Sequence, residues 1–428
     1  MKRKPRTRKS ASQGRSARHQ QPLEQRLLIT AVLCLLAFGA LMVYSASSAT
    51  TLLKGQGNGT LYLVRYSVNA LIGLAVMGIL MRVGPTRIRQ LIPVALISAF
   101  VMLFAVLIPG IGVEVNGARR WLGVGPLQFQ PSEVMKVVLV LYSAHLLASR
   151  PKCVRTLQTL VNPLLLVGAA AILLVSVADL GTGLVMAFAL GALLIVGGAQ
   201  LKHLALLSGT AIFLAGLFAV MEPYRRARLS AFLNPWADAS TTGFQAVQGQ
   251  IALGSGGLFG LGPGQSVQKV FYLPEAHTDF ILAVVGEELG LIGIIGLLFL
   301  YSLIAFAGLR TAKKARDRYT KLVAAGLTSL IVLQAMLNIF TVLGLAPLTG
   351  VPLPFISYGS TNLIVLLGAM GLLIHIASGR NRIRMVKGKS TVKSKRVGAK
   401  HAAESRSRSG GNRRTRSASA SGRRRTAR

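Results

Sequence analysis

The sequence is poor in acidic residues and almost devoid of cysteine. It has 12 Asp and Glu against 49 Lys and Arg, and two cysteines in 428 residues. Cys34 lies in an apolar run and Cys153 in a basic segment, so neither a disulfide nor a metal site is expected from them. A Walker loop and a nucleophile elbow are also absent. These absences argue against a disulfide-rich secreted fold, a Cys/His metal centre and a nucleotide-driven enzyme.

Long apolar runs are what the sequence does contain. It is 52% hydrophobic and only 14% charged, and many of its runs approach the ~20 residues needed to cross a bilayer. The first run is long enough to span and is followed by others, so we expect a retained helix rather than a cleaved signal peptide. The pattern predicts an all-α polytopic membrane protein. Its ten expected spans are about 27–47, 61–83, 91–110, 131–149, 159–178, 181–199, 202–221, 279–308, 321–345 and 361–378.

Basic residues are concentrated at the two ends of the chain. Residues 1–26 hold nine Lys and Arg with one acid, and residues 379–428 hold eighteen with one acid. Both tails lack apolar periodicity and are predicted to be disordered, flanking a membrane domain at 27–378. With both termini cytoplasmic, 40 basic residues lie inside and 8 outside, as the positive-inside rule requires. The tails favour contact with anionic lipid, and nucleic-acid binding is unlikely.

The polar connections are expected on the outer face. The longest, 222–278, follows the seventh span and has 57 residues, which predicts a folded cap with short helices of its own. Nine of the twelve acids fall on this face or within the membrane. The chemistry of this protein is therefore expected at the outer leaflet.

Four carboxylates crowd the stretch FYLPEAHTDFILAVVGEELG, residues 271–290. Asp279 is expected in the first turn of the eighth span, where helix capping alone would explain an acid. Glu287, eight residues on, would lie roughly 12 Å deeper in a straight helix, where an ionised Glu needs a partner or water. The pattern predicts a polar crevice with Asp279 at its mouth, and His277 close enough to orient a substrate.

The stretch GARRWLGVGPLQFQPSEVMK, residues 117–136, places two adjacent arginines outside. Arg119 and Arg120 can grip a phosphate with the guanidinium fork, although together with Trp121 they also fit an interfacial anchor. On a helix, adjacent residues point about 100° apart, so we expect only one arginine, Arg120, to reach a phosphate.

Further polar residues lie within or beside the spans. Glu133 and Lys136 are spaced i,i+3 and can pair on one helix face, an arrangement more typical of architecture than of catalysis. Asp179, between two short spans, is expected near Lys136, sharing its charge with Glu133. Ser357, in the Pro- and Gly-rich stretch PLTGVPLPFISYGSTNLI, is an expected polar ligand.

Four segments in order carry a family resemblance: NGARRWLGVGPLQFQPSE, FLNPWAD, SVQKVFYLPEAHTDFILAVVGEELG and GVPLPFISYGS. Over about residues 25–380, the chain resembles the SEDS family of membrane glycosyltransferases, which includes FtsW, RodA and SpoVE. QKVFYLPEAHTDF resembles the FtsW/SpoVE branch, and an FtsW-like member is expected. The departures are Gly243-Phe244, where Gly-Tyr is common, and ADLGTG, where PDLGT is common; neither removes a charge.

The resemblance implies a polymerase of lipid II, the undecaprenyl-diphosphate-linked disaccharide-pentapeptide. It implies that Asp279 is the essential base and that Arg119, Arg120 or a divalent cation (Mg²⁺ or Mn²⁺) neutralises the leaving diphosphate. It also implies a class B penicillin-binding protein as partner and a place at the division septum of the cytoplasmic membrane. A RodA-like elongation polymerase, a lipid II flippase and a scaffold for a transpeptidase are the alternatives.

Overall fold

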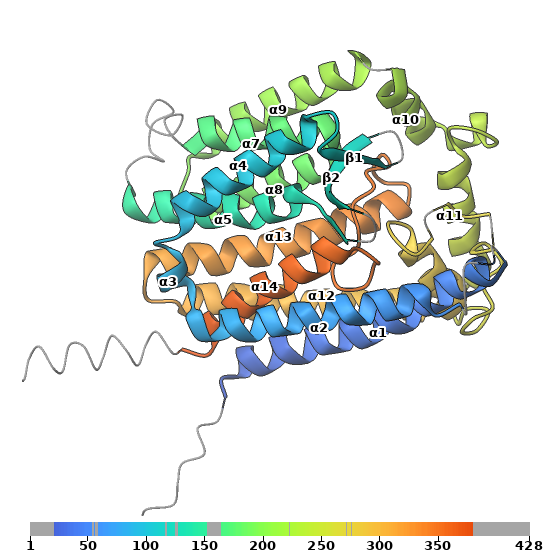
Figure 1. The fold of residues 1–428 in the computed structure, drawn as a ribbon, viewed down its shortest axis with the longest axis horizontal. Coiled ribbons are helices and arrows are strands. Elements are labelled where there is room, and N and C mark those ends of the chain that lie inside the picture. The colour runs from blue at the N-terminus through green and yellow to red at the C-terminus, as the bar shows by residue number, and fades with distance from the viewer. Residues whose placement is uncertain are drawn as a thin grey trace, which may run out of the picture. The chain divides into compact units, whose positions relative to one another are not determined.

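The computed structural model describes residues 21–53, 55, 59–115, 118–124, 127–151, 164–221, 223–270, 272–274 and 276–379. Almost all of both predicted basic tails lies outside these residues, so their disorder stays a prediction. Helices dominate the described chain (Figure 1). Those on the predicted spans are α1 (Leu23–Leu53), α2 (Leu61–Val83), α4 (Ile92–Leu107), α5 (Pro131–Ser149), α7 (Leu166–Ala178), α8 (Leu180–Gly197), α9 (Leu201–Met221), α12 (Ile281–Lys314), α13 (Arg318–Val342) and α14 (Ser360–Ala377).

The predicted membrane class is confirmed. Among the described residues, seven helices are long and apolar enough to cross a membrane, and Ile92–Leu107 and Leu166–Ala178 are shorter apolar helices. Each of the ten expected spans falls on a helix, although the described part of the fifth begins only near Leu166. The chain is a multi-pass helical membrane protein.

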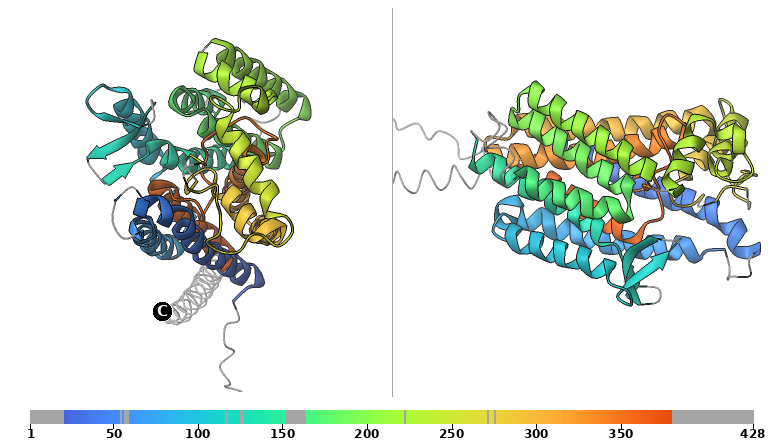
Figure 2. Two further views of the ribbon diagram at one scale, coloured as in Figure 1. Left: turned by 90° about the vertical axis from the view of Figure 1, so that its right-hand side faces the viewer. Right: turned by 90° about the horizontal axis from the view of Figure 1, so that it is seen from above.

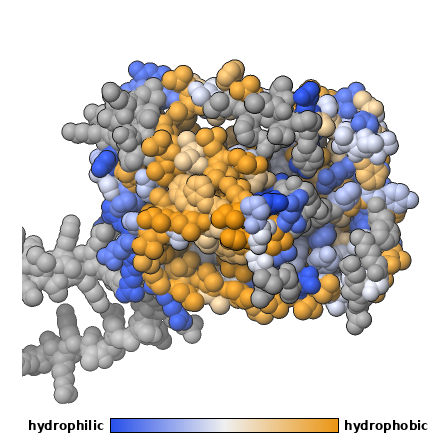
Figure 3. All heavy atoms as spheres, turned by 45° about the horizontal axis from the view of Figure 1, so that its top comes forward, coloured by the Kyte–Doolittle hydropathy of each residue, from blue (hydrophilic) through white to orange (hydrophobic). Residues whose placement is uncertain are grey.

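The bundle is built around its last two helices. In both α13 and α14, 72% of the most apolar window is buried inside the protein, against 17% in α2. α14 packs along α2, while α13 packs against α5, α8 and α12. Figure 3 shows hydrophobic side chains gathered in a broad band between more polar ends. This band is the surface that bilayer hydrocarbon would cover.

The sequence-predicted loop 111–130 forms a small sheet, which the all-α expectation lacked. β1 (Gly112–Val115), β2 (Ala118–Val124) and β3 (Leu127–Phe129) pair antiparallel in the order β1-β2-β3. A register shift between Val113 and Glu114 interrupts the first pairing. The Asn-Gly dipeptide at 116–117 is a strong hairpin signal that was available in the sequence.

The sheet lies at the same end of the bundle as the short helices of the long connection (Figures 1 and 2). These are α10 (Pro223–Leu233), the 3₁₀ helix η2 (Pro235–Asp238) and α11 (Phe244–Gly256), and they supply the short helices expected within 222–278. The short helix α3 (Pro85–Ile88) lies at the opposite end (Figure 1). The polar connections therefore form a cap at one end of the bundle.

The eighth span is not the straight helix that we expected. Gly290 interrupts α12 with φ 64° and ψ −160°. A methyl group placed on Gly293 would lie 3.3 Å from Val285 Cγ1, eight residues away. In a straight helix such residues are separated by about 12 Å along the axis. The segment before Gly290 therefore folds back sharply on the segment after it.

Candidate active site

Asp279 lies at the cap end of the bundle, just ahead of α12. We expected it in the first helical turn, but Phe280 is the N-cap and Asp279 precedes it. Its carboxylate is partly exposed, and Thr278 Oγ1 donates to Oδ1 at 3.1 Å. Its backbone carbonyl accepts from Asn338 Nδ2 at 2.7 Å. A methyl group placed on Gly350 would lie 3.9 Å from Asp279 Oδ2, so the carboxylate faces the connection between α13 and α14.

Within this connection, residues 343–359, the carbonyl groups of residues 351, 352, 354 and 355 are bound by side chains of α13, α12 and α2. Asn338 binds the carbonyl of Val351 at 2.8 Å and Gln334 binds that of Pro352 at 3.0 Å. The remaining two donors are hydroxyls: Tyr301 to the carbonyl of Pro354, at 2.6 Å, and Tyr66 to that of Phe355, at 2.5 Å. Because its carbonyls are bound individually, the connection forms a fixed wall beside Asp279.

Ser357 was expected to be an open polar ligand, and its placement argues against that role. It is 4% exposed, and its Oγ accepts from the backbone N–H of Leu353 at 2.9 Å. The hydroxyl therefore closes a turn within the connection 343–359.

Glu133 and Lys136 form the intramembrane pair that their spacing predicted. Lys136 Nζ lies 2.9 Å from Glu133 Oε2, with both side chains at most 1% exposed. Lys136 also donates to Gln334 Oε1 at 2.8 Å, and Asn362 Nδ2 donates to Glu133 Oε2 at 2.7 Å. Since Gln334 also binds the carbonyl of Pro352, this pair is linked through one side chain to the wall beside Asp279.

The expected contact between Asp179 and this pair is wrong. Asp179 caps α8 instead, accepting from Thr182 N at 3.1 Å and Thr182 Oγ1 at 2.7 Å. Gln130 Nε2 donates at 3.4 Å to Oδ2, the oxygen that also accepts from Thr182 Oγ1. The amides Gln334 and Asn362 occupy the places beside the Glu133–Lys136 pair because they extend from neighbouring helices at the same depth.

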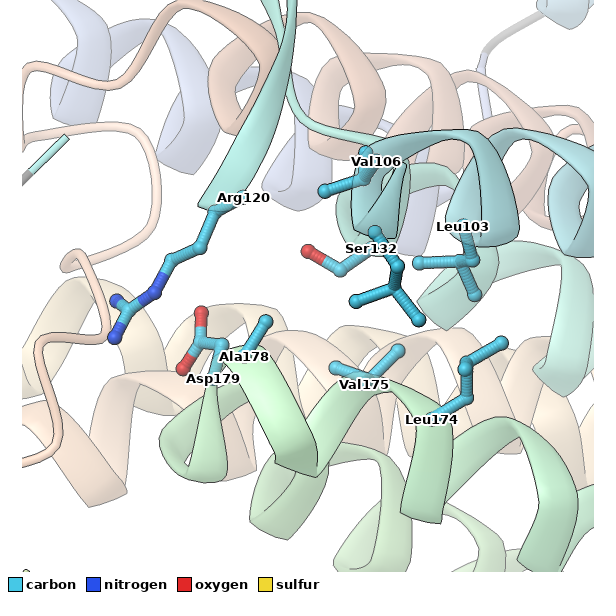
Figure 4. Close-up of a pocket in the computed structure, with 9 residues that line it drawn as sticks. Leu103, Val106, Arg120, Ser132, Leu174, Val175, Ala178 and Asp179 are labelled. Atoms are coloured by element: carbon cyan, nitrogen blue, oxygen red, sulfur yellow. The ribbon is translucent and has the colours of Figure 1, made fainter. Parts of the chain in front are cut away.

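Arg119 and Arg120 lie on strand β2, not on a helix, so their side chains point to opposite faces of the sheet. Arg119 Nε meets Glu114 Oε2 at 3.3 Å, with both side chains exposed. Arg120 lines a pocket with Asp179, and its guanidinium points toward that carboxylate (Figure 4). Within the described chain, the buried Nε of Arg120 has no hydrogen-bond partner.

The other members of this pocket come from three helices and complete a mixed polar and apolar lining. Ser132 contributes a hydroxyl, and the rest is apolar, from Leu103, Val106, Leu107, Leu174, Val175 and Ala178. Trp121, next on the strand, is half-buried and lies opposite Val113. Arg119 and Arg120 therefore differ in surroundings because they alternate along a strand and not along a helix, and the predicted preference for Arg120 as the phosphate ligand stays a prediction.

The pocket and Asp279 lie against the same connection. A methyl group placed on Gly181, two residues after Asp179, would lie 2.5 Å from the carbonyl oxygen of Thr349. The next residue, Gly350, faces Asp279. Residues 349–351 thus run between Asp179, which is the N-cap residue of α8, and the candidate base Asp279.

Glu287 does not line an open crevice. It is 1% exposed and belongs to the segment of α12 before the reversal at Gly290. Its carboxylate accepts from Ser266 Oγ, and from the backbone N–H groups of Val267 at 2.9 Å and Gln268 at 3.3 Å. Glu287 therefore connects the cap to α12, which is a structural role, but the helix that carries it is not the straight span that we expected.

Sequence reasoning missed the partner of the neighbouring carboxylate, Glu288. Lys269 Nζ lies 2.7 Å from Glu288 Oε1, with side chains 4% and 1% exposed. Ser45 of α1 donates to both oxygens of Glu288, at 2.6 and 2.8 Å. No local spacing signals this pair, because Lys269 and Glu288 are 19 residues apart and Ser45 is far away in sequence.

Metal-binding geometry and titration add little to this site. Across the described residues, no three His, Cys, Asp or Glu side chains gather into a group that could hold a metal ion. In the cap, hydrogen bonds from Thr241 and Thr242 hold the pKa of Asp238 below its usual range. Asp238 is exposed and distant in sequence from Asp279, so it marks a second, separate acid of the cap.

A family model described as "Cell cycle protein", covering FtsW, RodA and SpoVE, matches residues 25–382. This chain belongs to that family. It is 38% identical over 353 residues to the "Probable peptidoglycan glycosyltransferase FtsW" of Geobacter sulfurreducens, covering 82% of this chain and 94% of the relative. It is 40% identical over 354 residues to the "Stage V sporulation protein E" of Bacillus subtilis, covering 82% and 96%.

Solved structures resemble this FtsW/RodA/SpoVE family member over most of its length. One, titled "Structural coordination of polymerization and crosslinking by a peptidoglycan synthase complex", gives a TM-score of 0.68 at 28% identity and covers 82% of this chain and 97% of that one. The rod shape determining protein RodA of Thermus thermophilus gives 0.60 at 28% identity, covering 82% and 96%. The resemblance seen in the four sequence segments is thereby confirmed at the level of family and fold.

Proposed function

We propose that this protein is an FtsW-like peptidoglycan glycosyltransferase, which polymerises lipid II into glycan strands at the outer leaflet during septal wall synthesis. Relatives named as probable peptidoglycan glycosyltransferases, at 38–40% identity over nearly their whole length, support the enzyme class. The observation that carries the proposal is the setting of Asp279. It is a partly exposed carboxylate at the cap end, facing a connection whose carbonyls are bound individually.

The reaction joins two sugars without a nucleotide. The 4-hydroxyl of the acceptor GlcNAc attacks C1 of the donor MurNAc, a new C1–O bond forms with inversion, and the C1–O bond to undecaprenyl diphosphate breaks. A hydroxyl is a poor nucleophile unless a base takes its proton as the bond forms. In this proposal Asp279 takes that proton, and the connection 343–359 holds the acceptor side of the site in place.

The leaving diphosphate requires positive charge. Arg120 supports this role because its guanidinium lines the pocket and its buried Nε has no partner within the described residues. Lys136 is already compensated by Glu133 in the interior of the bundle, whereas Arg119 lies on the exposed face of the sheet, beside Glu114. No group of three or more His, Cys, Asp or Glu side chains that could hold a metal ion is found among the described residues, and the predicted Mg²⁺ or Mn²⁺ stays a prediction.

Cellular context extends the proposal. The solved synthase complex among the structural relatives supports a transpeptidase partner, for which we propose a class B penicillin-binding protein. Both termini are proposed to be cytoplasmic, which places the cap and Asp279 outside and the excess of basic residues inside. Location at the division septum follows from the FtsW-like assignment.

A polymerisation assay tests the function directly. Purified full-length protein in liposomes, with and without the partner, is given lipid II, and products are read as glycan ladders on a gel. Asp279→Asn should insert and bind lipid II but lose polymerisation by at least about 10²–10⁴-fold, the usual contribution of a general base.

The matched control for this assay is Asp238→Asn, which makes the same change at an exposed acid of the cap. It should leave the ladders unchanged. Near-normal ladders from Asp279→Asn would contradict the assignment of the base. If the wild-type protein with its partner makes no polymer but moves lipid II across liposomes, the flippase alternative replaces the enzyme.

A further inference from the structure

Three aromatic rings from distant parts of the chain meet beside Asp279. Tyr62 comes from the first turn of α2, His277 from the turn before α12, and Tyr358 from the end of the connection before α14. The ring centroids of Tyr62 and His277 are 4.4 Å apart, those of Tyr62 and Tyr358 5.1 Å, and those of His277 and Tyr358 5.7 Å. The backbone N–H of Tyr358 also donates to the carbonyl of His277 at 3.0 Å.

The exposure of these rings separates them from ordinary core aromatics. All three are partly exposed, whereas the neighbouring Phe280 and Phe355 are each 1% exposed. The aromatic cluster of Tyr62, His277 and Tyr358 therefore does not fill the interior. It presents ring surface at the end of the bundle where Asp279 also lies.

The three rings meet at an angle and not in a stack. The interplanar angles are 54°, 89° and 41°, so no pair among them stacks face to face. One edge-to-face contact and two tilted contacts hold the rings together. An isolated tyrosine at a membrane interface needs no such contacts, so an interfacial belt does not account for the arrangement.

We propose that the aromatic cluster is the subsite for the acceptor sugar. Tyr62 positions the sugar there, although the sequence around Tyr62 does not indicate this role. This inference rests on the proposed function and specifies where the N-acetylhexosamine ring lies. A pyranose has an apolar face of C–H bonds and a polar rim, which suits rings with an apolar face and a hydroxyl or imidazole edge. His277 is two residues from Asp279, so a sugar held on the cluster has its hydroxyl edge within reach of the base.

The test compares ring removal with ring retention at one position. In the polymerisation assay, Tyr62→Leu should raise KM for lipid II about tenfold with a smaller effect on kcat, whereas Tyr62→Phe should stay within about twofold, because the ring face carries the contact. Tyr272→Leu is the matched control, since Tyr272 is an exposed tyrosine of the cap outside the cluster. It should leave KM unchanged.

A soluble probe isolates recognition of the sugar. The free GlcNAc-MurNAc disaccharide, which lacks lipid and diphosphate, should inhibit the wild-type enzyme competitively against lipid II. Tyr62→Leu should weaken that inhibition by about the same tenfold factor as KM, since the probe offers only sugar contacts. Wild-type inhibition of Tyr62→Leu overturns the subsite.

Two further results would overturn the inference without touching the proposed function. One is a Tyr62→Leu enzyme with wild-type KM and a lowered unfolding temperature, which would make the cluster purely structural. The other is an equal rise of KM in Tyr272→Leu. If the wild-type protein forms no polymer, the proposed function fails, and the acceptor subsite fails with it.

Discussion

Two buried ion pairs in this protein are built in different ways. Glu133 and Lys136 are three residues apart on α5, and both are at most 1% exposed. Lys269 and Glu288 are equally enclosed, at 4% and 1%, but one belongs to the cap and the other to the folded-back start of α12. The first pair is a local feature of one helix, whereas the second exists only because the chain reverses at Gly290.

The difference shows two uses of a buried charge. The α5 pair is completed by amide side chains of α13 and α14, so it joins helices within the membrane region. The cap pair is completed by Ser45 of α1 and the carbonyl of Gly264, so it fastens the cap to the bundle. A buried charge that loses its partner is strongly destabilising, and we expect a smaller cost for the pair under the cap than for the pair inside the bundle. The predictions below rank the two pairs on this basis.

The largest effect is expected from Lys136→Met. Among the described residues, this change leaves the buried carboxylate of Glu133 with the amide of Asn362 as its only side-chain partner, which typically costs about 3–5 kcal/mol. Unfolding temperature in detergent should fall markedly, together with activity. The Glu133→Gln/Lys136→Met double variant removes both charges and should recover much of the loss. A single variant that melts at the wild-type temperature would show that the pair is not structural.

Gly290→Ala is expected to have the second-largest effect on stability, because it strains the chain reversal on which the Lys269–Glu288 pair depends. A methyl group there would lie 2.4 Å from the backbone nitrogen of Gly260, and the left-handed φ of 64° disfavours alanine. Strain and overpacking together should cost about 2–4 kcal/mol in the free energy of unfolding. Gly296→Ala, in the same helix with no neighbouring atom within 4 Å, should melt like the wild type. Equal melting of both variants would refute the reversal.

Lys269→Met should cost less than Lys136→Met. The hydroxyl of Ser45 still donates to Glu288, so about 1–3 kcal/mol is expected. Hydrogen exchange should rise in residues 264–269 before the bundle itself loosens, because the contact fastens only the cap. If hydrogen exchange instead rises uniformly along the chain, the Lys269–Glu288 pair stabilises the whole protein, as the Glu133–Lys136 pair does. The proposed difference between the two pairs would then be wrong.

The smallest effect on stability is expected at a third pair, Arg119 with Glu114. Their side chains are 42% and 54% exposed, so Arg119→Lys should change stability by no more than about 1 kcal/mol. Arg120→Lys should also fold but should weaken lipid II use, because lysine loses the guanidinium fork. Polymerisation rates against lipid II concentration decide this. Unchanged kinetics in both single variants and in the double variant would leave the arginines as interfacial anchors.

The membrane bundle could be predicted well because its signals are local. Apolar runs near 20 residues locate spans, and every expected span falls on a helix. The i,i+3 spacing of Glu133 and Lys136 likewise depends on one helix alone. The sheet at 112–129 was missed although its hairpin dipeptide was in the sequence, because short strands between turn residues also read as a loop.

The candidate site was predicted only in part. Asp279 and His277 do lie at the cap end, and Arg120 does face inward while Arg119 pairs outside. Asp179 was placed with the wrong partners and Ser357 proved to be buried, because depth along the chain does not say which side chain of a neighbouring helix is closest. The position of Glu287 was predicted wrongly, because the spacing of the residues around it does not indicate the chain reversal at Gly290.

By itself, the sequence determined the membrane class, the positions of the spans, the concentration of basic residues at the two ends of the chain and the local ion pair, since each depends on composition or on spacing within one segment. Only the tertiary structure decided that Tyr62 meets His277, that Lys269 finds Glu288 and that Arg120 shares a pocket with Asp179. Those contacts join elements whose order along the chain does not indicate their distance in space, and only the packing of the helices together with the sheet and the connections brings them together.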